Sequence, residues 1–172
     1  MVVDLLAKEL GIRLGKSFFS NFLYSRGGYR GNNISLVKPL TYMNRSGEIL
    51  NKLLCKKGVS PDNMVVVLDS MDLHPGVVRF KKKGGGAGHN GLQSLLDYYD
   101  GSDELKRFYV GIGRPEDPSE VVQYVLGVPS GDELLKIEKG IRIAAQGILM
   151  LAETSPDQVM NEINRIKNRP DN

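Results

Sequence analysis

The chain has 172 residues, of which 41% are hydrophobic and 25% are charged, with 23 Lys and Arg against 20 Asp and Glu. This length fits one domain with a substantial core, and no apolar run reaches the length of a bilayer, so we do not expect an integral membrane protein. The single cysteine, Cys55, excludes a disulfide framework and a thiolate zinc cluster and favours a reducing, cytoplasmic setting. We expect no signal peptide, because Asp4 and Glu9 interrupt the first apolar residues.

The first third of the chain predicts a helix, two strands and a second helix. Apolar residues at helical spacing predict a helix over 3–10, with Gly11 as its C-terminal stop. Strands are expected over 18–24 and 34–37. The polar loop between them contains three glycines, Gly27, Gly28 and Gly31. A second helix is expected over 44–57, with Cys55 as a small core residue.

The middle of the chain predicts alternating strands and helices. Residues 64–68 are consecutive apolar residues, typical of a strand that is buried on both faces in a parallel sheet. Residues 77–82 alternate in the manner of an edge or antiparallel strand. A glycine-rich loop, a helix over 90–99 and a strand over 108–112 follow.

The C-terminal third is predicted to be helical, because three capping patterns begin there. Asp117, Ser130 and Ser155 each stand three residues before a Glu or Gln. The second of these helices carries an apolar stripe of Leu134, Ile137, Ile141, Ala144, Ile148 and Leu151. Because strands alternate with helices, we expect a single α/β domain over residues 1–172 with a mixed sheet.

Three polar loops are candidates for chemistry, and the first covers residues 38–47. The pattern favours Asn44 as the N-cap of the following helix. The functional alternative is that an asparagine beside an aromatic ring grips a peptide-like or sugar-phosphate ligand, since a helix N-terminus also attracts negative charge.

The second loop begins at Asp69, at the C-terminal edge of the strand over 64–68, where open α/β sheets place their ligands. A carboxylate there can orient and stabilise a histidine base. The alternative is that Asp69 and Asp72 satisfy turn amides, and the residues alone favour neither account. We expect no metal, because no third and fourth ligand lies nearby. His74 is expected to face solvent.

The third loop joins three lysines, Lys81, Lys82 and Lys83, to four glycines before His89. Such a loop either is a solvated surface or binds a nucleic-acid backbone, because glycine lets phosphate approach the backbone amides. Neither the P-loop nor the dinucleotide-binding spacing fits. His89 could bind phosphate, cap the next helix or act as a base.

Together these loops resemble bacterial peptidyl-tRNA hydrolase over essentially the whole chain. The matching stretches, in chain order, are 38–39, 42–44, 46–47, Asp69, 72–76, 88–92, 110–115 and 159–161. The resemblance implies a single-domain, three-layer α/β/α fold with a mixed, mostly parallel sheet. It also implies hydrolysis, without metal or other cofactor, of the ester that joins a peptide to tRNA, which frees stalled tRNA for reuse.

The resemblance implies roles for residues of all three loops. Asp69 would orient the catalytic histidine, while Asn44 and Asn90 would hold the peptide and the terminal nucleotide around the reacting carbonyl. An aminoacyl ester is already activated, so a positioned water and a base can suffice, with amide groups stabilising the developing oxyanion.

The remaining implied contacts are with the tRNA. Tyr42 and Met43 would line the site for its 3′ end, His89 would help bind it, and Lys81 matches one of two basic positions that hold the 5′-phosphate. A double-stranded acceptor stem would be recognised through phosphate and shape. We expect a cytoplasmic monomer with peptidyl-tRNA as its partner.

Some positions depart from the family pattern. The family's first strand, its Asn-Pro-Gly turn and its base histidine have no counterpart within residues 1–172, which begin inside the first helix. Tyr109 stands where the family's second phosphate-binding residue is an arginine, and Ser70 replaces an acidic residue. Either the natural protein starts upstream of Met1, which we favour, or the chain is an RNA-binding relative of the splicing-facilitator type. We expect little hydrolase activity from residues 1–172 alone, and substitution of His89 as the base is the least favoured alternative.

Overall fold

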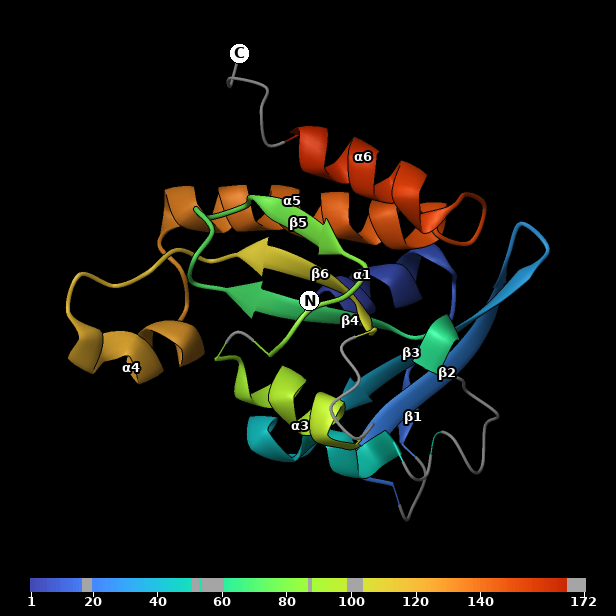
Figure 1. Ribbon diagram of the computed structural model, residues 1–172, viewed down its shortest axis with the longest axis horizontal. Helices are drawn as coiled ribbons and strands as arrows, with labels where there is room; N and C mark the ends of the chain where they lie inside the picture. Colours follow the sequence, from blue (N-terminus) through green and yellow to red (C-terminus); the bar gives the residue numbers. More distant parts are fainter. Residues whose placement is uncertain (17–19, 51–52, 54–60, 87, 99–103, 167–172) are drawn as a thin grey trace. The chain divides into compact units, whose positions relative to one another are not determined.

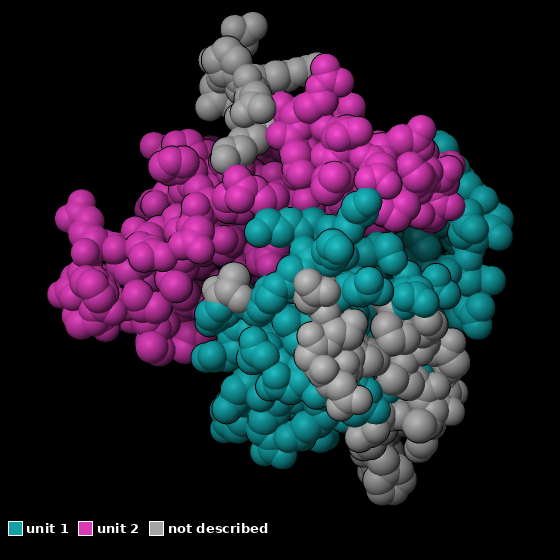
Figure 2. Space-filling view, viewed as in Figure 1, with its two compact units in different colours: residues 1, 3–66, 81–107 teal, residues 2, 67–80, 108–172 magenta. Residues whose placement is uncertain are grey.

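The computed structural model describes residues 1–16, 20–50, 53, 61–86, 88–98 and 104–166. The chain divides into two compact units, shown in different colours in Figure 2. The first comprises Met1, residues 3–66 and residues 81–107, and the second comprises Val2, residues 67–80 and residues 108–172. The single domain over residues 1–172 stays a prediction. Among the described residues, no helix is long and apolar enough to span a membrane.

The first helix, α1 (Val2–Glu9), ends at a glycine as its sequence predicts. Gly11 has a φ of 64°, a left-handed conformation that glycine adopts without strain. The amide of Ile12 then donates to the carbonyl of Ala7 at 2.9 Å, which satisfies a carbonyl of the last helical turn. The predicted helix with Gly11 as its stop is confirmed.

The first unit contains an antiparallel sheet with strand order β1-β2-β3 (Figure 1). Its strands are β1 (Gly15–Lys16), β2 (Phe22–Tyr29) and β3 (Asn32–Pro39). Residues 17–19, where the strand over 18–24 was expected to begin, lie outside the described residues. Both strands at the hairpin are longer than the sequence pattern predicts.

The turn between β2 and β3 is correspondingly shorter than predicted. Gly27 and Gly28 lie within β2, and only Arg30 and Gly31 connect the strands. Both turn residues have positive φ, 45° and 81°, as in the two-residue turns that follow the twist of a hairpin. The expectation that Gly27 belongs to a loop was wrong, because Gly27 lies within β2. A Cβ at this position would lie 3.0 Å from a side-chain carbon of Ile12, which explains why the residue is a glycine. Packing accounts for this glycine.

The expected helix over 44–57 is a 3-10 helix at its start, η1 (Met43–Ile49). Asn44 is not its N-cap, contrary to the favoured account of the loop. The residue before the first turn is Tyr42, and no side chain caps the helix. Residues 51–52 and 54–60, with Cys55 and the end of the expected helix, lie outside the described residues. A second short 3-10 helix, η2 (Pro61–Asn63), follows.

The second sheet has strand order β4-β6-β5. Its strands are β4 (Val65–Ser70), β5 (Val78–Lys81) and β6 (Lys106–Gly111). In Figure 1, β6 runs in the direction of β4 and against β5, so this sheet is mixed. The α/β fold with a mixed sheet is confirmed. The described strands form two sheets, and β1-β2-β3 is wholly antiparallel.

Burial in the second sheet differs from the prediction for its first strand. In β4 only Leu68 is buried, so this strand is not buried on both faces as expected. The buried strand is β6, whose residues from Arg107 to Gly111 are all buried. The reason is position, because β6 lies between two described strands whereas β4 and β5 lie at the edges. The edge position predicted for β5 is confirmed.

The helices of the C-terminal third begin at the predicted capping residues. They are η3 (Pro118–Glu120), α4 (Val121–Leu126), α5 (Gly131–Met150) and α6 (Pro156–Ile166). Asp117 accepts a hydrogen bond from the amide of Ser119 at 2.8 Å, and Ser155 and Gln158 cap each other reciprocally. Ser130 is the N-cap residue of α5 as predicted, although its hydroxyl donates to the Glu133 carboxylate at 2.9 Å and accepts no hydrogen bond from the helix backbone.

Helices α5 and α6 contribute to the described core of the second unit. Ile137, Ile141 and Ala144 of the predicted stripe are buried. The side-chain carboxamide of Asn164 in α6 makes two hydrogen bonds to the backbone of Phe80. Its oxygen accepts one from the Phe80 N–H at 2.9 Å, and its nitrogen donates one to the Phe80 carbonyl at 3.1 Å. This double hydrogen bond satisfies backbone groups of the edge strand β5, which would otherwise be open to further pairing.

Candidate functional site

The predicted site residues are divided between the two units. Six of them belong to the first unit, namely Tyr42, Met43, Asn44, Lys81, His89 and Asn90. Asp69 belongs to the second unit and is described there. The first group lies on three segments, the start of η1, the end of β5 and the start of α3 (Asn90–Tyr98).

Within the first unit, η1 and α3 meet at a glycine. The amide of Gly47 donates to the hydroxyl of Ser94 at 3.0 Å. A Cβ at Gly47 would lie 2.2 Å from the backbone carbonyl oxygen of Ser94, a distance that real Cβ atoms do not show. Only glycine therefore permits this approach of the two segments, and the sequence pattern did not indicate that role.

A second contact of η1 with α3 involves predicted site residues. A Cβ at Gly91 would lie 2.5 Å from the Met43 sulfur and 3.2 Å from the His89 ring. Met43 and His89 thus flank the first turn of α3. Asn44 follows Met43 in the chain and Asn90 precedes Gly91, and both asparagines are exposed. The structure therefore places the two predicted amide residues on adjoining segments.

Two large side chains, Tyr42 and Met43, are exposed at the start of η1. Tyr42 is 80% exposed and Met43 is 53% exposed, although large apolar side chains normally gain from burial. The hydroxyl of Thr41 is buried and, among the described residues, meets no hydrogen-bond partner. A buried hydroxyl without a hydrogen-bond partner lowers the stability of the fold unless a bound molecule supplies that partner. Sequence reasoning missed Thr41, because no pattern distinguishes such a threonine.

His89 is the N-cap of α3. Its Nδ1 accepts a hydrogen bond from the amide of Leu92 at 3.2 Å, and its own amide donates to the carbonyl of Gly86 at 2.9 Å. Of the three roles that the sequence left open, capping is therefore present in the structure. Because Nδ1 accepts, a neutral ring carries its proton on Nε2, which can donate to a ligand.

The glycine-rich loop is held by a buried arginine that the sequence did not point to. The side chain of Arg107 is 0% exposed. Its Nε donates to the carbonyl of Leu105 at 2.9 Å, and its terminal nitrogen donates to the carbonyl of Gly85 at 3.0 Å. Lys81, at the start of the loop, is exposed. An arginine in a strand ordinarily predicts an exposed face, so its burial was not anticipated.

In the second unit, Asp69 is the penultimate residue of β4 and is half-buried. The backbone beyond it is fixed by the end of β6, because Ile112 donates to the Ser70 carbonyl and Gly113 to the Leu73 carbonyl, each at 3.0 Å. The predicted place of Asp69 at a strand end is confirmed. The carboxylate is thus carried on a firmly held backbone.

The other polar residues of this loop have separate roles. Asp72 accepts from the Arg114 guanidinium at 2.6 Å, and both side chains are exposed. His74 is exposed as predicted, and its carbonyl accepts from the Val77 amide. Within the described part of the chain, no three His, Cys, Asp or Glu side chains are grouped as a metal ion would require.

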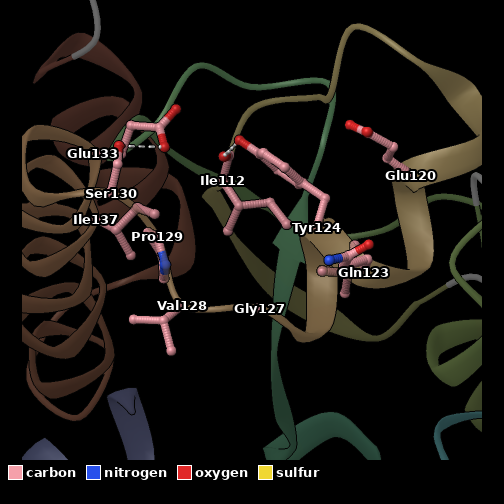
Figure 3. Close-up of a pocket in the computed structure, with 11 residues that line it drawn as sticks. Ile112, Glu120, Gln123, Tyr124, Gly127, Val128, Pro129, Ser130, Glu133 and Ile137 are labelled. Carbon is pink, nitrogen blue, oxygen red and sulfur yellow. Dashed lines mark hydrogen bonds between the residues drawn. The ribbon is translucent and has the colours of Figure 1, made fainter.

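A cavity of about 420 Å³ lies between α4 and the start of α5 in the second unit (Figure 3). Its wall includes Ile112, whose carbonyl accepts from the Tyr124 hydroxyl at 2.7 Å. Burial raises the pKa of Tyr124, and the nearby Glu133 carboxylate adds to the effect. Since the Ile112 amide bonds to Ser70, the cavity begins beside the strand end that carries Asp69. No sequence pattern predicted it.

Comparisons with known proteins match this chain to one protein family over nearly its whole length. Residues 1–171 match the family model described as peptidyl-tRNA hydrolase. Over 164 residues the chain is 40% identical to peptidyl-tRNA hydrolase of Bacillus subtilis (strain 168), which covers 95% of this chain and 86% of that protein. It is 35% identical to the protein of the same name from Caldanaerobacter subterraneus subsp. tengcongensis, with 95% and 87% covered.

Solved structures show the same relationship. The chain matches a crystal structure of peptidyl-tRNA hydrolase in complex with N-propanol with a TM-score of 0.87 and 31% identity, covering 95% of this chain and 82% of the other. Peptidyl-tRNA hydrolase of Acinetobacter baumannii matches with a TM-score of 0.86, at the same identity and coverage.

Proposed function

Because this chain belongs to the peptidyl-tRNA hydrolase family, we propose that it hydrolyses the ester between peptide and tRNA in peptidyl-tRNA, which returns the tRNA of stalled translation to use. The match extends over residues 1–171 and includes all three loops that carry the predicted site. The relatives reported above are named as hydrolases. The alternative of an RNA-binding relative of the splicing type therefore gains no support.

The observation that carries the site assignment is the close contact of η1 with α3. It holds Asn44 and Asn90 on adjoining segments, beside the exposed Tyr42 and Met43. We assign to the two carboxamides the tasks of holding the acyl group and stabilising the oxyanion that develops on its carbonyl. Tyr42 and Met43 then offer apolar surface to the 3′-terminal nucleotide.

Asp69 serves to orient a histidine base and to stabilise its charge after it takes a proton from water. A half-buried carboxylate on a fixed strand end suits this task. The 172 residues contain two histidines, His74 and His89. His89 is poorly suited to be the base, because its Nδ1 is engaged by the Leu92 amide and its Nε2 carries the proton.

His89 suits tRNA binding instead, since Nε2–H can donate to a phosphate oxygen while Nδ1 caps the helix. Lys81 contributes an exposed cation for the 5′-phosphate on the loop that Arg107 holds. Tyr109, at the position of the family's second cation, is 9% exposed, so we expect a weaker phosphate clamp. We further propose that the chain works as a monomer in the cytoplasm, where the acceptor stem of peptidyl-tRNA is its partner.

The test measures hydrolysis of diacetyl-Lys-tRNA with and without added imidazole. We expect little turnover from residues 1–172 alone, because His89 caps α3 and His74 is an exposed loop residue, and a clear increase when imidazole supplies a base. Asp69→Asn should abolish that increase. Asp72→Asn is the matched control, since Asp72 is exposed and paired with Arg114, and it should keep the increase.

Each outcome bears on a separate part of the proposal. Turnover at the rate of the family without imidazole would overturn the expectation that residues 1–172 lack the base. An equal imidazole effect in Asp69→Asn and in the unaltered chain would overturn the role of Asp69. Absence of specific hydrolysis under both conditions would overturn the assigned activity for these residues.

A further inference from the structure

The charge along the chain is distributed unevenly in one region. Between Glu9 and Glu48 the sequence contains six basic residues and no acidic one. These residues are Arg13, Lys16, Arg26, Arg30, Lys38 and Arg45. Arg26 lies in β2 and Arg30 in the turn that follows it, so these two cations stand at the hairpin end of the antiparallel sheet. Lys16 pairs with Leu23 and lies on the opposite face from Arg26.

Two of these cations are neutralised locally. Lys38 pairs with Asp4 at 2.9 Å, and Arg45 pairs with Glu48, with a second contact at 3.0 Å. In the described part of the chain, Arg13, Lys16 and Arg26 form no ion pair, and all three are exposed. Positive charge that is not neutralised by the protein attracts a polyanion.

The hairpin presents its arginines on a rigid surface. Arg26 lies opposite Ser35 in the register of β2 and β3, and exposed Gly28 lies opposite exposed Asn33. Arg30 follows in the two-residue turn. Arg26 and Arg30 are separated along β2 and its turn, so the two side chains can contact separate phosphates of one strand.

Two tyrosines of the hairpin, Tyr24 and Tyr29, each contact a neighbouring polar or charged side chain. The Arg30 guanidinium lies 5.6 Å from the ring centroid of Tyr29, over its face. The Tyr24 hydroxyl shares a hydrogen bond with that of Ser35 at 3.2 Å. Single-stranded RNA is usually bound by open aromatic faces, whereas a duplex is bound through its phosphates and 2′-hydroxyl groups.

We propose that the hairpin surface, defined as Arg26 and Arg30 with the backbone between them, binds the phosphate backbone of a double-stranded RNA segment. The hairpin surface is separate in sequence from the lysine loop, from η1 and from Asp69. The proposal rests on the proposed function in one respect, in that tRNA is the RNA concerned. It adds to that function a second region of contact with the substrate.

The experiment measures the affinity for deacylated tRNA between 50 and 200 mM salt. The test variant combines Arg26→Gln and Arg30→Asn, since asparagine tolerates the positive φ of the turn. The matched control combines Lys136→Gln and Arg142→Gln on the exposed side of α5, which removes the same charge. Thermal unfolding of both variants checks that they fold.

Neutralising two phosphate contacts should reduce the slope of log affinity against log salt by about 2. Over this fourfold range of salt, the unaltered chain should therefore lose roughly 16-fold more affinity than the test variant. A duplex acceptor stem should show the same difference, and a single strand of equal length should not. The control should retain the original slope.

Equal slopes for the test variant and the control would overturn the proposal, as would a dependence limited to single strands. If the double variant does not fold, Arg26→Gln alone should lower the slope by about 1, and no change would again overturn the proposal. The outcome is independent of the proposed activity. In the presence of imidazole, hydrolysis with an unchanged KM in the test variant refutes the hairpin surface alone. Hairpin-dependent tRNA binding without imidazole-dependent hydrolysis refutes the activity alone.

Discussion

The contact of η1 with α3 at Gly47 allows a sharp test of how the two asparagines are positioned. In Gly47→Ala, the new methyl group would lie 2.2 Å from the Ser94 carbonyl oxygen and 3.0 Å from its carbonyl carbon. The obstructing atoms belong to the α3 backbone, so no side-chain rotation relieves the clash. Ordinary contact begins at 3.4 Å, and η1 must therefore move away from α3 by about 1 Å.

This displacement has a cost in stability and in catalysis. Overpacking of this kind costs about 1–3 kcal/mol, which corresponds to a melting temperature lower by roughly 2–12 °C for a chain of this size. A shift of about 1 Å between groups that bind the same acyl centre reduces the rate by roughly 100-fold. We therefore expect Gly47→Ala to lose most of the imidazole-dependent hydrolysis while it still folds.

The assay combines thermal unfolding with diacetyl-Lys-tRNA hydrolysis in the presence of imidazole. Gly131→Ala is the matched control, because a Cβ at Gly131 meets nothing within 4 Å and the residue begins α5. The control should be unchanged or slightly more stable, since alanine restricts the unfolded chain. If Gly47→Ala matched Gly131→Ala in both melting temperature and rate, the close approach would not position the site.

Three further predictions concern single side chains. His89→Asn should keep the cap of α3, because asparagine is a good N-cap, but should weaken tRNA binding through loss of the Nε2–H donor. His89→Ala should weaken tRNA binding and also lower the melting temperature. Equal melting temperatures for the two variants would contradict the capping role. Arg107→Met should lower the free energy of unfolding by about 1–3 kcal/mol, because the Leu105 and Gly85 carbonyls lose their hydrogen-bond donors. Denaturant titration measures this change. An unchanged free energy of unfolding would show that these hydrogen bonds are dispensable. The backbone amide of Ser119 lowers the pKa of Asp117, so the stability that this cap adds is present above the ordinary pKa of 3.8 and is lost as the pH falls through the lowered value. The difference in melting temperature between the unaltered chain and Asp117→Ala should therefore vanish in acid. A difference that grew in acid would contradict the capping role.

Features that depend on neighbours in the sequence were predicted well. The end of α1 at Gly11 follows from one glycine in a left-handed conformation, and the start of α6 follows from the reciprocal cap of Ser155 and Gln158. The helix expected over 90–99 is α3, Asn90–Tyr98. Each of these signals acts within a few residues, so the sequence alone contains the information.

Features that depend on distant neighbours were decided only in the tertiary structure. The apolar run of β4 predicted burial on both faces, but burial depends on which strands lie beside it, and β6 occupies the middle of the described sheet. Gly27 and Gly47 are glycines because Ile12 and Ser94 approach them, a requirement that no local pattern reveals.

The same division holds for the site. The residue types and their order along the chain were sufficient to identify the family, because the three loops carry their motifs as contiguous sequence. Only the folded chain decided that His89 caps α3, that Arg107 is buried beneath the glycine-rich loop, and that η1 lies against α3. Hydrogen bonds and close contacts join residues that are far apart in sequence, so their geometry becomes definite only when the chain has folded.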